Sequence, residues 1–127
     1  MADPVVHFEI IGTDPAGLRQ YYAELFGWQF AVDDAVTEQV SAPGEYGFVD
    51  GTTTGEGTGL NGGVGGGPRH TPKSLFYVGV PDVEAALAQA ERLGGQRVFG
   101  PEGVPGKLIV GQFTDPEGNL VGVAGTA

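Results

Sequence analysis

The sequence of 127 residues contains no cysteine. This absence excludes disulfides, thiolate nucleophiles, and zinc or iron–sulfur sites built from cysteine ligands. Its only two serines, Ser41 and Ser74, lie outside any G-x-S-x-G context, so a serine nucleophile has no support either. Any chemistry of this chain must therefore come from side chains with oxygen or nitrogen groups.

Positive charge is also scarce, with six lysines and arginines against sixteen acidic residues and a formal net charge of −10. Nucleic acids need a basic patch for their phosphates, so no nucleic-acid partner is expected. A neutral or cationic small molecule is more plausible, although an acidic surface also simply favours solubility. The N-terminal segment MADPVVHFEII has neither a basic leader nor a long apolar run, which predicts a cytoplasmic protein without a membrane span.

Glycine is in excess, with 24 residues where an average composition of about 7% gives roughly 9. Eleven of the glycines lie between Gly44 and Gly67. We interpret the glycine-rich segment from about residue 62 to 73 as a flexible linker, with a mobile loop over a ligand site as the alternative. The stretch GTGLNG matches G-x-G-x-x-G, but no helix can follow it, so nucleotide binding is not expected.

Two parts of the chain repeat one pattern, which indicates two stacked supersecondary units. An apolar strand, VVHFEII or SLFYVGV, leads to an aspartate next to a proline, then to an amphipathic helix that ends at glycine. We place one unit at about residues 4–66 and the other at about 74–125. The length of 127 residues fits a single domain that contains both.

In the first unit, residue spacing indicates which side of the predicted strand and of the predicted helix is apolar. Phe8 and Ile10 alternate with His7 and Glu9, so one strand face is apolar and the other is polar. A helix should begin after Asp14, with its apolar positions from Leu18 to Phe26 on one side. We expect that helix face to pack on Phe8 and Ile10.

The remaining elements follow from turn residues and alternation. Strands are predicted at residues 28–32, 45–50 and 59–64 in the first unit, and a helix from Val83 to about Leu93 in the second. Asp82 should cap this helix as Asp14 caps the first. Strands at residues 96–100, 107–113 and 119–124 complete the second unit, with the segment TDPEGN as a tight turn.

Three segments together resemble the vicinal oxygen chelate superfamily, which groups glyoxalases, bleomycin-resistance proteins and extradiol dioxygenases. They are HFEI with DPAGLRQYYAELFGW, then VPDVEAALAQAERLGG, and the terminal FTDPEGNLVGV. The resemblance implies an α+β fold of two paired βαβββ modules whose curled mixed sheets enclose a cleft. It also implies that a homodimer is possible.

The resemblance further implies four metal-ligand positions, one on the first and one on the last strand of each module. His7 matches one position, but Leu75 and Gly122 stand at two others and cannot coordinate a metal. Asn61 is the only candidate at the fourth, and hard cations prefer carboxylates. Because catalytic metal sites normally hold three protein ligands, we expect no metal cofactor.

Our leading hypothesis is a small-molecule binding protein of this superfamily that works without a metal and resembles its antibiotic-sequestering branch. The alternative is a lyase, isomerase or dioxygenase with a reduced metal site, or with His7 and Glu9 as a metal-free acid and base. A scaffold with a vestigial cleft is a third possibility. The expected ligand-binding residues are His7, Glu9, Trp28, Phe48, Asn61, Leu75, Tyr77 and Gly122.

Overall fold

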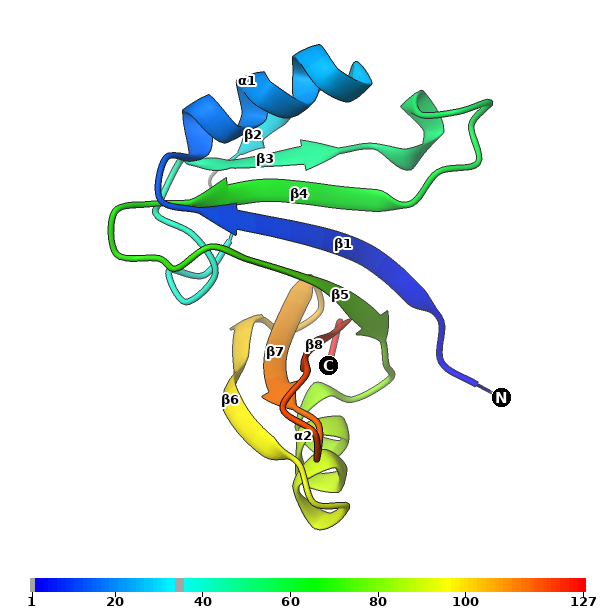
Figure 1. The fold of residues 1–127 in the computed structure, drawn as a ribbon. Helices are drawn as coiled ribbons and strands as arrows, with labels where there is room; N and C mark the ends of the chain where they lie inside the picture. The colour runs from blue at the N-terminus through cyan, green and yellow to red at the C-terminus, as the bar shows by residue number, and fades with distance from the viewer. Residues whose placement is uncertain (1, 34–35) are drawn as a thin grey trace. The chain divides into compact units, whose positions relative to one another are not determined.

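The structure, a computed structural model, describes residues 2–33 and 36–127. The chain forms two compact units (Figure 1). The first unit is His7–Ser74, and the second is Leu75–Ala127 together with the N-terminal residues up to Val6. In the second unit the Gly79 amide donates to the Pro4 carbonyl at 2.8 Å, which ties the N-terminal segment to it.

The first unit is built on a four-stranded mixed sheet in the order β2-β3-β4-β1. Strands β1 and β4 pair in parallel, whereas β3 pairs antiparallel with both β2 and β4. Figure 1 shows α1 lying over one face of this sheet. The elements are β1 (Val5–Gly12), α1 (Pro15–Phe26), β2 (Ala31–Asp33), β3 (Tyr46–Val49), a 3-10 turn η1 (Gly51–Thr53) and β4 (Asn61–Gly66).

The second unit repeats this topology, with the strand order β5-β8-β7-β6. Here β5 and β8 pair in parallel, and β7 pairs antiparallel with both β8 and β6. The elements are β5 (Lys73–Gly79), α2 (Val83–Arg92), β6 (Gln96–Val104), β7 (Leu108–Thr114) and β8 (Leu120–Gly125). The predicted α+β class and the two βαβββ modules are confirmed.

Both helices begin where the sequence predicts. The Asp14 carboxylate accepts from the Gly17 amide at 3.2 Å, and that of Asp82 accepts from the Ala85 amide at 3.0 Å. Each bond satisfies an amide that the first turn of a helix leaves without a partner. Gly27 ends α1 in the left-handed conformation, with φ of 74°.

The core of the second unit lies between α2 and its sheet. Val83 and Leu87 on the inner side of α2 are fully buried and pack with Ile109 and Val123 from β7 and β8. Burying such side chains contributes about 1.5–3 kcal/mol each. Among the described residues, neither α1 nor α2 is long and apolar enough to cross a membrane.

The prediction of a flexible linker from residue 62 is wrong. Strand β4 continues to Gly66 and is buried from its second residue, so the connection to β5 is limited to residues 67–72. A methyl group at Gly62 would lie 2.0 Å from the Phe8 ring, and one at Gly63 would lie 2.1 Å from Tyr46. The glycines therefore make room for aromatic rings against the strand.

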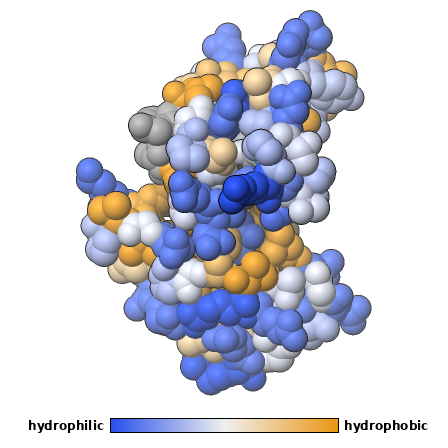
Figure 2. All heavy atoms as spheres, turned by 90° about the vertical axis from the view of Figure 1, so that its left-hand side faces the viewer, coloured by the Kyte–Doolittle hydropathy of each residue, from blue (hydrophilic) through white to orange (hydrophobic). Residues whose placement is uncertain are grey.

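The apolar face of α1 packs differently from our expectation. Tyr21, Leu25 and Phe26 are each more than half exposed. The inner contact runs through Trp28, whose ring centroid lies 5.1 Å from that of Phe8 and which also contacts α1. In the view of Figure 2, hydrophobic surface is interspersed with hydrophilic surface.

Strand β2 is also shorter than predicted at its N-terminal end, because it begins only at Ala31. Trp28 and Phe30 precede the strand, and their ring centroids lie 6.5 Å apart. Asp34 and Ala35, which follow β2, lie outside the described residues.

Candidate functional site

The polar face of β1 carries His7 and Glu9, as the alternation predicts. Glu9 is only 2% exposed, and the His7 ring is half-buried. Two aromatic rings from β3 lie beside His7: its centroid is 6.3 Å from that of Tyr46, nearly parallel, and 6.3 Å from that of Phe48, edge-on. An imidazole at this place has an apolar wall beside it.

Tyr46 connects the two polar residues of β1. Its hydroxyl donates to Glu9 Oε1 at 2.8 Å, and His7 Nε2 lies 2.8 Å from the same phenol oxygen. Glu9 and Tyr46 are both nearly inaccessible to solvent. The three side chains therefore form a continuous hydrogen-bond chain, and buried polar groups need such partners to avoid a desolvation penalty.

Strand β4 makes this contact possible because it lies between β3 and β1. Gly63 pairs with Glu9 on one side and with Phe48 on the other. With no side chain at Gly63 or Gly65, the Tyr46 ring lies flat over β4 and reaches Glu9 two strands away. The glycines of β4 thus position the site.

Burial lowers the pKa of His7 to about 4. Removing the ring from water disfavours the charged imidazolium, which shifts a histidine in this direction. His7 is therefore uncharged at neutral pH. It can accept a hydrogen bond or a proton, but it does not supply a positive charge to a ligand.

The lowered pKa of His7 predicts a pH-dependent stability. As the pH falls, His7 in the unfolded chain, with a pKa near 6.5, is protonated at a higher pH than His7 in the folded protein. Stability from this group is complete above about pH 6.5 and is lost as the pH falls towards 4, by about 2 kcal/mol after allowance for solvent screening. Urea unfolding of the wild type and of His7→Gln across this range measures the difference.

His70→Gln is the matched control, since His7 and His70 are the only histidines of the chain. The free energy of unfolding of His7→Gln should be flatter than that of the wild type between about pH 6.5 and 4. Equal slopes for the wild type and His7→Gln would contradict a depressed pKa at His7.

The structure separates the two aromatic candidates of the first unit. Phe48 stands with His7, and its ring centroid lies 4.9 Å from that of Tyr46. Trp28 instead contacts Phe8, which alternates with His7 on β1 and therefore points to the other side of the sheet. Of these two predicted residues, only Phe48 belongs to the surroundings of His7.

In the second unit, the Tyr77 ring also lies over a glycine of a neighbouring strand. Tyr77 pairs with Gly122, and a methyl group at Gly122 would lie 2.3 Å from its ring. Its hydroxyl accepts from Gln112 Nε2 at 2.8 Å, and both residues are nearly fully buried. Leu75 is buried as well, at 8% exposure. The aromatic ring fills the space that a side chain at position 122 would need.

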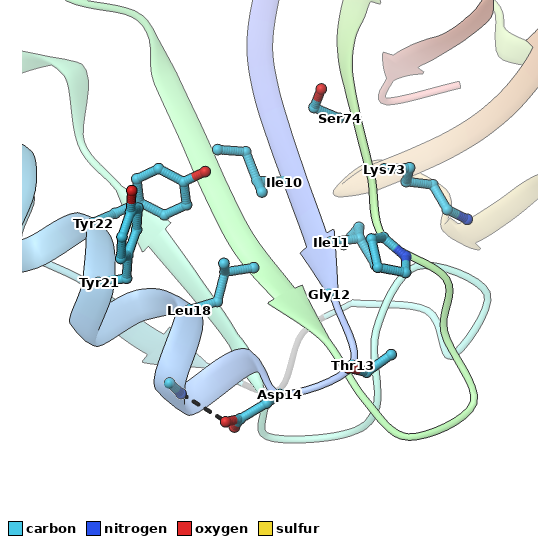
Figure 3. Close-up of a pocket in the computed structure, with 12 residues that line it drawn as sticks. Ile10, Ile11, Gly12, Thr13, Asp14, Leu18, Tyr21, Tyr22, Lys73 and Ser74 are labelled. Carbon is cyan, nitrogen blue, oxygen red and sulfur yellow. Dashed lines mark hydrogen bonds between the residues drawn. The ribbon is translucent and has the colours of Figure 1, made fainter.

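An open pocket of about 680 Å³ lies in the first unit, beside α1 (Figure 3). Its walls include Ile10, from the apolar side of β1, and Tyr21 and Tyr22 from α1. Asp14 at its edge is engaged as the helix cap, and the Lys73 side chain extends away from the tyrosines. None of the predicted site residues lines this pocket.

Residues 5–123 match the family model described as the Glyoxalase/Bleomycin resistance protein/Dioxygenase superfamily. The chain belongs to this superfamily. The match spans both βαβββ units and includes both residues of the polar face of β1. No curated protein matched the chain in a sequence comparison.

Solved structures of the same fold include epimerases. A methylmalonyl-CoA epimerase in complex with methylmalonyl-CoA and NH4+ is 14% identical, with a TM-score of 0.68, and the match covers 100% of this chain and 96% of that one. The Mycobacterium tuberculosis methylmalonyl-CoA epimerase is 12% identical, with a TM-score of 0.63 and coverage of 97% and 87%. At these identities the likeness shows the fold alone.

In this chain, the residues at the metal-ligand positions of the superfamily's enzymes do not form a set that fits a metal ion. At those positions only His7 offers a ring nitrogen, and Asn61 Oδ1 already accepts from the Gly51 amide at 2.8 Å. Leu75 has no donor atom, and Gly122 has no side chain. Within residues 2–33 and 36–127, no three His, Asp or Glu side chains are grouped to hold a metal ion.

Sequence reasoning missed Tyr46 and Gln112. One signal could have pointed to Tyr46: glycines inside a predicted strand often mark the close approach of another group. The glycines at 62, 63 and 65 could have indicated that rings lie on β4. Which ring lies there depends on the pairing register, which the sequence alone does not provide.

Proposed function

We propose that this protein binds a small neutral or cationic organic molecule at the polar face of β1, without a catalytic metal. The observation that carries this proposal is the loss of metal-binding side chains at the superfamily's ligand positions. Leucine and glycine replace two ligands, and Tyr77 packs where a residue 122 side chain would stand. His7, with Phe48 beside it, offers a hydrogen-bonding group next to an aromatic wall.

The charge of the chain bears on the class of ligand. A net charge of −10 repels polyanions such as the CoA ester bound by the epimerase of similar fold. The same charge attracts cations. Bleomycin, whose resistance proteins give the superfamily part of its name, is a basic glycopeptide. We therefore expect a cationic natural product to be preferred over a CoA ester.

Thermal unfolding with three probes tests the proposal. Metal-free bleomycin should raise the Tm, because a ligand that binds only the folded state stabilises it by about 2.7 kcal/mol at a hundredfold excess over Kd. Methylmalonyl-CoA should not raise it, and neither should nickel, zinc or manganese. His7→Gln should weaken the bleomycin shift, and His70→Gln should preserve it.

Two outcomes would overturn parts of this proposal. Near-stoichiometric metal in the purified protein, with a stabilisation that EDTA reverses, would contradict the metal-free site. A shift with methylmalonyl-CoA and none with bleomycin would contradict the preference for cations. Either outcome would instead favour a lyase, isomerase or dioxygenase function.

A second candidate function is metal-free acid–base catalysis by a lyase or isomerase. The chain of hydrogen bonds from His7 through Tyr46 to Glu9 favours it, because a proton accepted at the imidazole has a carboxylate within two hydrogen bonds. Deuterium exchange from solvent into a bound probe would separate the two functions. Binding without any exchange or conversion would leave only the first.

A further inference from the structure

The proton arrangement around Tyr46 follows from its single hydroxyl hydrogen. That hydrogen is donated to Glu9 Oε1, so the phenol oxygen has only lone pairs left for His7. His7 Nε2 lies 2.8 Å from this oxygen, so its nitrogen must be the donor. We infer that Tyr46 fixes His7 in the tautomer with the proton on Nε2, which makes Nδ1 the accepting nitrogen.

The surroundings of Tyr46 hold this arrangement in place. The ring is 2% exposed and lies on Gly63 and Gly65, with the edge of Phe48 at a centroid distance of 4.9 Å. Glu9, on β1 two strands away from β3, is equally buried. Turning the phenol or the carboxylate away would break a hydrogen bond between two buried groups. Tyr46 is therefore a positioning residue for His7.

The position of the proton can be measured without any ligand, so this test is independent of the proposed function. A long-range proton–nitrogen correlation spectrum of the ¹⁵N-labelled full chain at neutral pH resolves the ring nitrogens of both histidines. The signals lost in His7→Gln identify His7. We expect Nε2 at a shift typical of a protonated nitrogen and Nδ1 at that of an unprotonated one. The reverse pattern, or an average of the two, would overturn the inference.

Tyr46→Phe tests whether the phenol is the cause. This variant keeps the ring on Gly63 but removes the oxygen, so the two nitrogen shifts of His7 should move towards an average. A single Nε2–H tautomer in the variant would show that Tyr46 does not fix it. His70→Gln should leave the His7 signals unchanged.

A second measurement covers the case in which Tyr46→Phe does not fold. In the wild type, the Nε2 proton should be protected from exchange with solvent and should show a nuclear Overhauser contact to the Tyr46 ring. A rapidly exchanging Nε2 proton without this contact would overturn the assignment.

Discussion

Replacing Gly63 by alanine is expected to destabilise the protein by about 3 kcal/mol or more. The added methyl group would lie 2.1 Å from two carbons of the Tyr46 ring and 2.2 Å from its oxygen. The ring is buried and cannot move aside without breaking its bond to Glu9. Overpacking and a lost buried hydrogen bond therefore add together. Urea unfolding monitored by circular dichroism measures the change.

Gly118→Ala is a suitable control for this substitution. Its methyl group meets nothing within 4 Å, and only the positive φ of 92° opposes it. We expect a loss of about 1 kcal/mol from the left-handed conformation alone. If Gly63→Ala were no more destabilising than Gly118→Ala, the Tyr46 ring would not lie on β4 as described.

The architecture was predictable because its signals are local. Strand alternation placed His7 and Glu9 on one face, and aspartate before each helix predicted both N-caps. The repeat of strand, helix and three strands then predicted two equivalent units, and both sheets have the same strand order. Each of these inferences depends on neighbours within a few residues along the chain.

The connection between the polar residues was not predictable in the same way. Tyr46 is 37 positions from Glu9 in sequence, and their contact depends on the register of two strand pairings and on glycine between them. The glycine run was misinterpreted for the same reason. Flexible residues ordinarily weaken strands, but in β4 they admit aromatic rings, and the packing of those rings stabilises the strand.

The exposed face of α1 shows a different limit. Its apolar residues have the spacing of a buried helix face, yet Tyr21, Leu25 and Phe26 are more than half exposed. Periodicity identifies which residues share a face, but not which surface covers that face. The homodimer and the cleft implied by the family resemblance stay predictions.

Gly122 offers a direct test of why the chain does not fit the superfamily's metal enzymes. Those enzymes often carry glutamate at this position, and one substitution restores the carboxylate. A side chain at 122, however, would begin 2.3 Å from the Tyr77 ring, which is 2% exposed and bonded to Gln112. The carboxylate would have to displace a buried ring before it could bind anything.

Gly122→Glu is therefore expected to lose about 4 kcal/mol of stability, from overpacking and from a buried charge, without gaining a metal. Its Tm should be insensitive to nickel, zinc, manganese and EDTA, as expected for the wild type. A double-mutant cycle with Tyr77→Leu identifies the cause, because the loss at 122 should shrink by about 2 kcal/mol once the ring is absent. An EDTA-reversible stabilisation of the single variant by metal would instead mean that the missing carboxylate alone kept the site from forming.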